Sequence, residues 1–197
     1  MEDKIVDLWR WFVSSENHII KAIETGVGAD DVVEKMNELV LSFGMFTWHI
    51  EKGESKKWAF TISPNGDGEL LKISREVVLE APILSKWEFY HGKQPKTNWD
   101  RKFVIHDSEL DEQEIDASAW NYVLVPIENQ FELILEATNI GHIDDDAVIE
   151  VVDQFITYEL GEEVKINKIE SIEVKEEFDG EFKQNRKPVN SLKSTLA

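Results

Sequence analysis

The stretch Asn121–Thr138, NYVLVPIENQFELILEAT, decides the fold, because it places two apolar runs on either side of a short polar segment, 128–130. Runs rich in β-branched and large apolar residues favour strands, and the polar segment between them predicts the turn of a hairpin. Asp144–Asp146 follow as caps for a helix, Gly161 ends it, and 164–174 supplies another strand. The inward face of the helix is Val148, Val151, Val152, Phe155 and Ile156. Residues 121–176 therefore predict a strand–strand–helix–strand unit.

The same order of elements occurs earlier in the chain. Residues 45–50 and 58–62 predict two strands, and 63–68 form a turn rich in glycine, proline and asparagine. A helix follows, with its apolar face at Leu70, Ile73, Val77, Val78 and Ala81. Pro82 stops this helix, and 87–90 returns as a strand. The two units repeat a pattern of structure and not a sequence.

The first 44 residues predict a pair of helices. Apolar side chains recur there at helical spacing, at Ile5, Leu8, Trp9, Phe12, Ile19, Ile20 and Ile23 and again at Val32, Met36, Leu39, Val40 and Phe43. Gly26 and Gly28 separate the two segments.

The predicted fold class is α+β: an N-terminal helical pair followed by two strand–strand–helix–strand units that form a mostly antiparallel sheet with helices on one face. We expect a single domain over 1–180, made of the helical pair 1–44, a first unit 45–91, a loop-rich link 92–120 with one short strand at Lys102–His106, and a second unit 121–176. Residues 181–197 predict a polar, flexible tail.

Acidic side chains dominate the chain, which carries a formal net charge of −19 at pH 7. Residues 1–98 hold 16 acids and 12 bases, whereas 99–197 hold 24 acids and 9 bases. No lysine or arginine occurs from Phe103 to Val164, where seventeen aspartates and glutamates fall. Such a field repels nucleic acids and anionic membranes, and it attracts cations and basic protein surfaces.

Composition narrows the class of protein further. The absence of cysteine excludes disulfides and a thiol nucleophile, while 42% hydrophobic residues and seven tryptophans supply a sizeable core. The first residues lack the features of a signal peptide, and no apolar run approaches the roughly 20 residues that span a bilayer. We therefore expect a cytoplasmic protein that binds neither membrane nor nucleic acid.

Several landmarks are spread over most of the chain. They are Leu8-Trp9-Arg10-Trp11-Phe12 with Ser15-Glu16-Asn17, Ile62-Ser63-Pro64-Asn65-Gly66-Asp67, Glu80-Ala81-Pro82 with Trp87-Glu88-Phe89, Asp153 through Tyr158-Glu159-Leu160-Gly161-Glu162, and Pro188 with Leu192 and Leu196. Together they resemble an uncharacterised family associated mainly with Bacteroidetes-type genomes. Its motifs are aromatic anchors, turns and helix stops, and it has no established activity. The resemblance implies the fold and assigns no catalytic residue.

The acidic segment before the second unit is the first candidate site. Its residues are Asp107, Glu109, Asp111, Glu112, Glu114 and Asp116, with Trp99 in the preceding polar loop as a candidate exposed aromatic. We expect a loop that adapts to a basic protein partner. The alternative is a solvated surface that keeps the protein soluble, or one covered by the basic residues of the tail.

The second candidate is a metal site of His142, Asp144 and Asp146, with Glu136 from the preceding strand. Hard cations bind several carboxylate oxygens, and a neighbouring imidazole suits zinc, manganese or iron. The alternative is that these aspartates only cap the helix, since capping requires no more than this local sequence.

The leading hypothesis is a protein-binding or regulatory module without catalytic activity that engages a basic partner. No cofactor is predicted. A metal-dependent hydrolase or metal-binding protein using a divalent cation is one alternative, and a homodimerising module with an open sheet edge is the other. No nucleophile elbow, zinc-binding histidine pair or dinucleotide-binding loop occurs in the sequence.

Overall fold

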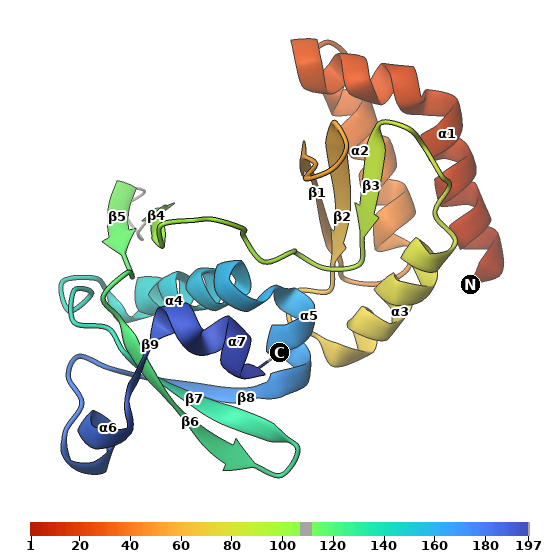
Figure 1. Ribbon diagram of the computed structural model, residues 1–197. Helices are drawn as coiled ribbons and strands as arrows, with labels where there is room; N and C mark the ends of the chain where they lie inside the picture. Colours follow the sequence, from red (N-terminus) through yellow and green to blue (C-terminus); the bar gives the residue numbers. More distant parts are fainter. Residues whose placement is uncertain (107–111, 197) are drawn as a thin grey trace. The chain divides into compact units, whose positions relative to one another are not determined.

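The computed structural model describes residues 1–106 and 112–196, which fall into two compact units, Met1–Lys93 and Gln94–Ala197 (Figure 1). The sequence predicts one domain over 1–180, and the structure differs because each unit buries an apolar cluster of its own. The boundary between the units lies within the predicted link, 92–120.

The first unit contains a helical pair and one strand–strand–helix–strand unit. Its elements are α1 (Glu2–Thr25), α2 (Ala29–Leu41), β1 (Thr47–Lys52), β2 (Trp58–Ser63), α3 (Gly68–Leu79) and β3 (Trp87–Tyr90). The sheet has the order β1-β2-β3, in which β1 pairs with β2 antiparallel and β3 pairs with β2 parallel. Both the helical pair and the order of elements after it agree with the sequence prediction.

An aromatic cluster forms the centre of the first unit. The ring of Phe12 on α1 lies 4.8 Å from that of Trp87 and 5.3 Å from those of Phe60 and Phe89, measured between ring centroids. Trp9 lies on α1 three residues before Phe12, and its ring meets that of Phe89 edge-on at 4.9 Å. These contacts fix α1 against the sheet.

The second unit contains two sheets and several helices. Its elements are β4 (Lys102–His106), β5 (Glu112–Asp116), β6 (Asn121–Ile127), β7 (Gln130–Glu136), α4 (Asp145–Leu160), α5 (Glu162–Lys168), β8 (Ile169–Lys175), α6 (Gly180–Asn185), β9 (Lys187–Pro188), the 3-10 helix η1 (Val189–Ser191) and α7 (Leu192–Leu196). The strands β4 and β5 pair antiparallel, and the larger sheet has the order β8-β7-β6-β9. The second strand–strand–helix–strand unit is therefore confirmed, with α5 as a short addition.

The fold class is α+β as predicted, but the expected single sheet is wrong. In each unit the helical segment connects the second strand to the last one, which pairs with it in parallel: β3 with β2, and β8 with β7. Each unit thereby completes its own sheet, and the described residues form a three-stranded, a two-stranded and a four-stranded sheet.

The predicted flexible tail, 181–197, has regular secondary structure in its described residues. Pro188 and Lys187 pair with Asn121 and Tyr122 of β6, and the side chains of Val189, Leu192 and Leu196 are buried in the core of the second unit. The hydroxyl of Tyr122 lies 2.8 Å from the Thr195 hydroxyl, within hydrogen-bond distance. Three apolar residues at near-helical spacing anchor the end of a segment that is otherwise mostly polar.

Among the helices of residues 1–106 and 112–196, none combines the length and the apolar character needed to cross a membrane.

Candidate functional site

The predicted acidic site falls partly on a strand. Glu112, Glu114 and Asp116 belong to β5, where Glu114 pairs with Val104 and Asp116 with Lys102 of β4. Asp107, Glu109 and Asp111 lie outside the described residues. The expectation of an adaptable loop is therefore wrong for 112–116, because Ile115 of β5 and its cross-strand partner Phe103 of β4 are buried and hold the hairpin against the core.

Asp116 is already neutralised by neighbours within the second unit. Hydrogen bonds from Ser118 and then from Lys102 lower the pKa of Asp116 to about 2, and its carboxylate lies 3.0 Å from the Lys102 ammonium. Two other acids of the described hairpin, Glu112 and Glu114, are exposed on the same strand.

The predicted metal residues have other roles where their side chains are described. Asp144 caps α4 by accepting a hydrogen bond of 2.9 Å from the Ala147 amide, which is the alternative that the sequence left open. His142 is exposed, and the side chain of Asp146 lies outside the described residues. Within the described part of the chain, no group of three or more histidine or carboxylate side chains could hold a metal ion.

Glu136 is held by protein donors on both of its oxygens. Its carboxylate accepts hydrogen bonds from the Phe178 amide at 2.8 Å, from Asn121 Nδ2 at 2.7 Å and from Arg186 Nη1 at 3.2 Å. Burial raises the pKa of Glu136, but the Phe178 amide, Asn121 and Arg186 together outweigh burial and lower it below the ordinary carboxyl value. A metal at His142 and Asp144 stays a prediction, and it would have to take Glu136 from these partners.

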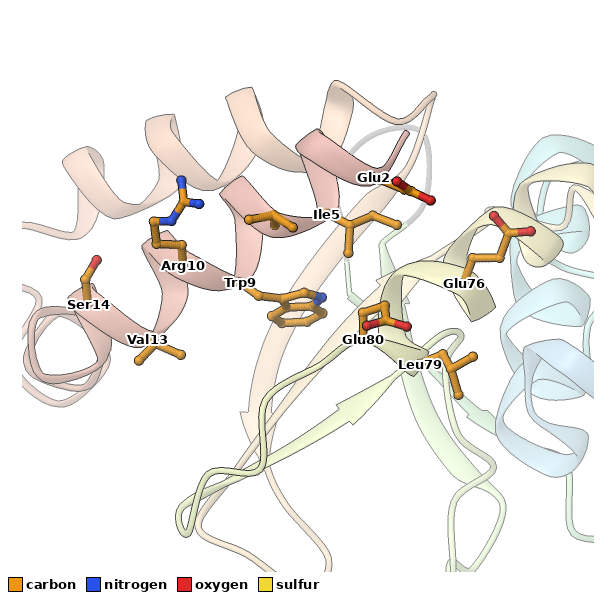
Figure 2. Close-up of a pocket in the computed structure, with 10 residues that line it drawn as sticks. Glu2, Ile5, Trp9, Arg10, Val13, Ser14, Glu76, Leu79 and Glu80 are labelled. Carbon is orange, nitrogen blue, oxygen red and sulfur yellow. The ribbon is translucent and has the colours of Figure 1, made fainter.

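A groove between α1 and α3 of the first unit was not predicted from the sequence. Its volume is about 930 Å³, and its lining residues are Glu2, Ile5, Val6, Trp9, Arg10, Val13 and Ser14 of α1 with Glu76, Leu79 and Glu80 of α3 and its C-cap. Figure 2 shows Trp9 in the middle of the groove, with Glu2 toward one end of α1 and Ser14 toward the other. From residue 2 to residue 14, α1 rises about 18 Å, which is roughly three helical turns.

The floor and the upper walls of the groove are apolar. Trp9 is buried on its floor, where its Nε1 donates a hydrogen bond of 2.8 Å to the Val77 carbonyl oxygen and so ties α1 to α3. Above it, Val6 is 50% exposed, Val13 is 46% exposed and Leu79 is 82% exposed. Three large aliphatic side chains open to solvent around one concave surface are typical of a binding site.

The rim of the groove is acidic. Glu2, Glu76 and Glu80 line it, and the one base, Arg10, already pairs with Asp7 at 3.1 Å. The last turn of α3 contains no basic residue, so its C-terminal carbonyl groups add partial negative charge at Leu79 and Glu80. The groove therefore favours an apolar ligand that carries positive charge at its edges.

A second apolar stripe on α1 could have indicated the groove. Val6, Trp9 and Val13 recur at i, i+3 and i+7, beside the inward stripe of Ile5, Leu8 and Phe12. The second stripe forms a groove only because α3 packs beside it. The contact that brings the two helices together, from Trp9 to Val77, joins residues 68 positions apart in the sequence.

Comparison with known proteins adds no relative, since no family model, no curated protein and no solved structure matches the chain. The resemblance to the bacterial family therefore stays a prediction.

Proposed function

We propose that this protein is a cytoplasmic protein-binding or regulatory module, without catalytic activity, that engages a basic partner. The observation that carries the proposal is the groove between α1 and α3, with exposed Val6, Val13 and Leu79 above its floor and Glu2, Glu76 and Glu80 on its rim. The β4–β5 hairpin of the second unit carries exposed acids of its own, Glu112 and Glu114.

An amphipathic helix is the occupant that suits this groove. Both walls are helices, so the groove offers no strand edge for an extended peptide to pair with, whereas a helix can lay an apolar stripe along Val6, Trp9 and Val13. Lysine or arginine beside that stripe would meet Glu76 and Glu80. Three turns of groove match three turns of ligand, or about 11 residues.

A charge placed on the wall of the groove should weaken this binding strongly. We expect Val13→Asp to weaken capture of a fluorescent, lysine-flanked amphipathic helical peptide by at least about tenfold, because an unpaired carboxylate would be desolvated against the apolar stripe. Fluorescence anisotropy gives the dissociation constant. The matched control is Val33→Asp on α2, since Val33 is 45% exposed against 46% for Val13 and does not line the groove. Equal weakening by both substitutions, or by neither, contradicts the proposal.

Reversing one rim charge should change the salt dependence of binding. We expect Glu76→Lys to slow peptide association at about 50 mM salt and to have little effect at about 500 mM, where the Debye length falls from about 14 Å to about 4 Å. Stopped-flow anisotropy measures the rate. Glu34→Lys on α2 makes the same charge change at an exposed position away from the groove. If it slows association as much as Glu76→Lys, the rim has no special role.

A further inference from the structure

Two aromatic rings of the second unit meet at a right angle and hold a lysine ammonium. The rings of Trp99 and Tyr158 have centroids 5.5 Å apart and planes inclined by 85°. Lys96 Nζ lies 3.5 Å from the Tyr158 ring centroid and 5.8 Å from that of Trp99. We call this pair of rings, Trp99 and Tyr158, the aromatic corner.

Among the residues that the structure describes, aromatic faces and not a carboxylate hold the ammonium of Lys96. Within the described part of the chain Lys96 forms no ion pair, although the unit around it is strongly acidic. Lys57 gives a contrast, because its Nζ lies 5.6 Å from the Trp58 ring and is paired with Glu24. Lys96 is exposed and lies in an acidic unit, yet its ammonium rests on two rings, as expected for a corner that attracts a cation.

The corner keeps its shape independently of the Lys96 side chain. Trp99 packs against Phe103 and Phe155 at 6.2 and 6.1 Å between centroids, and the Tyr158 hydroxyl accepts a hydrogen bond of 3.1 Å from Gln154 Nε2. The backbone amide of Lys96 donates to the Tyr158 carbonyl oxygen at 2.7 Å. The exposed Lys96 side chain can therefore leave while its backbone and both rings stay in place.

The second cation near the corner is fixed and neutralised. The guanidinium carbon of Arg101 lies 6.0 Å from the Trp99 ring centroid, and its Nη2 donates to the buried Glu159 carboxylate at 2.9 Å. Arg101 thus supports Trp99 as a permanent neighbour, whereas Lys96 is a replaceable one.

We propose that the aromatic corner is a binding site for an alkylammonium cation, and that Lys96 is an internal occupant which the ligand displaces. A trimethylammonium group fits the chemistry best, since a ring pair binds a bulky, weakly hydrated cation more readily than a hydrated primary amine. The group could belong to a methylated lysine of a protein or to a free quaternary amine, and both present the same chemistry. This site uses no residue of the α1–α3 groove, so it stands or falls separately from the proposed function.

The test is a titration of the full chain with tetramethylammonium, in which the NMR resonance of the Trp99 indole N–H reports binding. The resonance is assigned by its loss in Trp99→Phe. We expect Lys96→Ala to raise the affinity about three- to tenfold, because the competing internal cation is gone. Lys57→Ala removes another lysine that lies over a tryptophan, in the first unit, and should leave the affinity unchanged. Tyr158→Phe keeps the ring and should keep binding, whereas Tyr158→Leu should abolish it.

The outcomes separate the proposal from its alternatives. Lys96→Ala changes an exposed side chain, so an unchanged affinity in this variant overturns the displacement of Lys96. Binding that persists in Tyr158→Leu overturns the site itself. A trimethyllysine peptide that binds more tightly than tetramethylammonium identifies a protein side chain as the ligand. Equal affinities for the two identify a free quaternary amine, and either result supports the corner as the binding site.

Discussion

Replacing Phe12 by alanine is expected to destabilise the first unit by about 4 kcal/mol, within the usual range for truncating a buried aromatic side chain. Phe12 is completely buried, and its ring lies within 5.9 Å, between centroids, of four other aromatic rings. Alanine would lose all four contacts and leave a cavity that α1 and the sheet cannot close without moving Trp9 or Trp87. This is the largest effect we expect from any single substitution in the protein.

Hydrogen exchange on the full chain measures this loss unit by unit. In Phe12→Ala the free energy of opening that protects amides of β2 and β3 should fall by the same amount, about 4 kcal/mol. Protection in β6 and β7 should not change, because the two apolar clusters share no residue. Val13→Ala, at the next and half-exposed position, is the control and should cost less than about 1 kcal/mol. A loss in Phe12→Ala no larger than that of Val13→Ala would show that the aromatic cluster does not hold the unit together.

The second large effect is expected at Glu136, where glutamine should destabilise the second unit by about 3 kcal/mol. Glutamine has the shape of glutamate but presents an amide donor to the Phe178 amide, Asn121 and Arg186, which are all donors themselves. One donor would be left unpaired in a buried site, and the Arg186 guanidinium would lose its counter-charge. Chemical denaturation gives the difference in the free energy of unfolding.

The pH dependence of this difference follows from the lowered pKa of Glu136. Since the folded protein lowers the pKa below its unfolded value near 4.5, the unfolded state takes up the proton first as the pH falls. The stabilisation by Glu136 is complete above that value and is lost as the pH falls toward the folded pKa. The difference in the free energy of unfolding between wild type and Glu136→Gln should therefore become smaller below about pH 4.5. Glu132→Gln, on the same strand, should show neither the 3 kcal/mol loss nor the narrowing; the same behaviour at Glu132 would argue against a special role for Glu136.

Local sequence signals predicted most elements of the fold. Asp144 caps α4 with its side chain, the turn predicted over 63–68 leads into α3, Gly161 lies between α4 and α5, and the polar residues 128–130 mark the turn between β6 and β7. Each of these signals acts over a few residues, so one sequence is enough to find it.

Long-range packing explains what the sequence did not predict. The strand β9 has only two residues and depends on β6, more than sixty residues earlier, for its pairing. Whether two strand–strand–helix–strand units share one sheet likewise depends on contacts between segments far apart. The groove arises where Val6 and Val13 of α1 meet Leu79 of α3, and neither helix alone reveals it. Charge drew attention to Asp107–Asp116 instead, because composition shows where acids are numerous and not where a concave surface forms.

The burial of Val189, Leu192 and Leu196 in the second unit sets an order of events during synthesis. All residues of the first apolar cluster have been made by the time Phe89 leaves the ribosome, so this unit can fold while the rest of the chain is still being translated. The other cluster lacks its last member until Leu196 emerges, and β6 lacks its partner β9 until Pro188 does. Translation should therefore pass through a stage with the first unit folded and the second still waiting for its final helix.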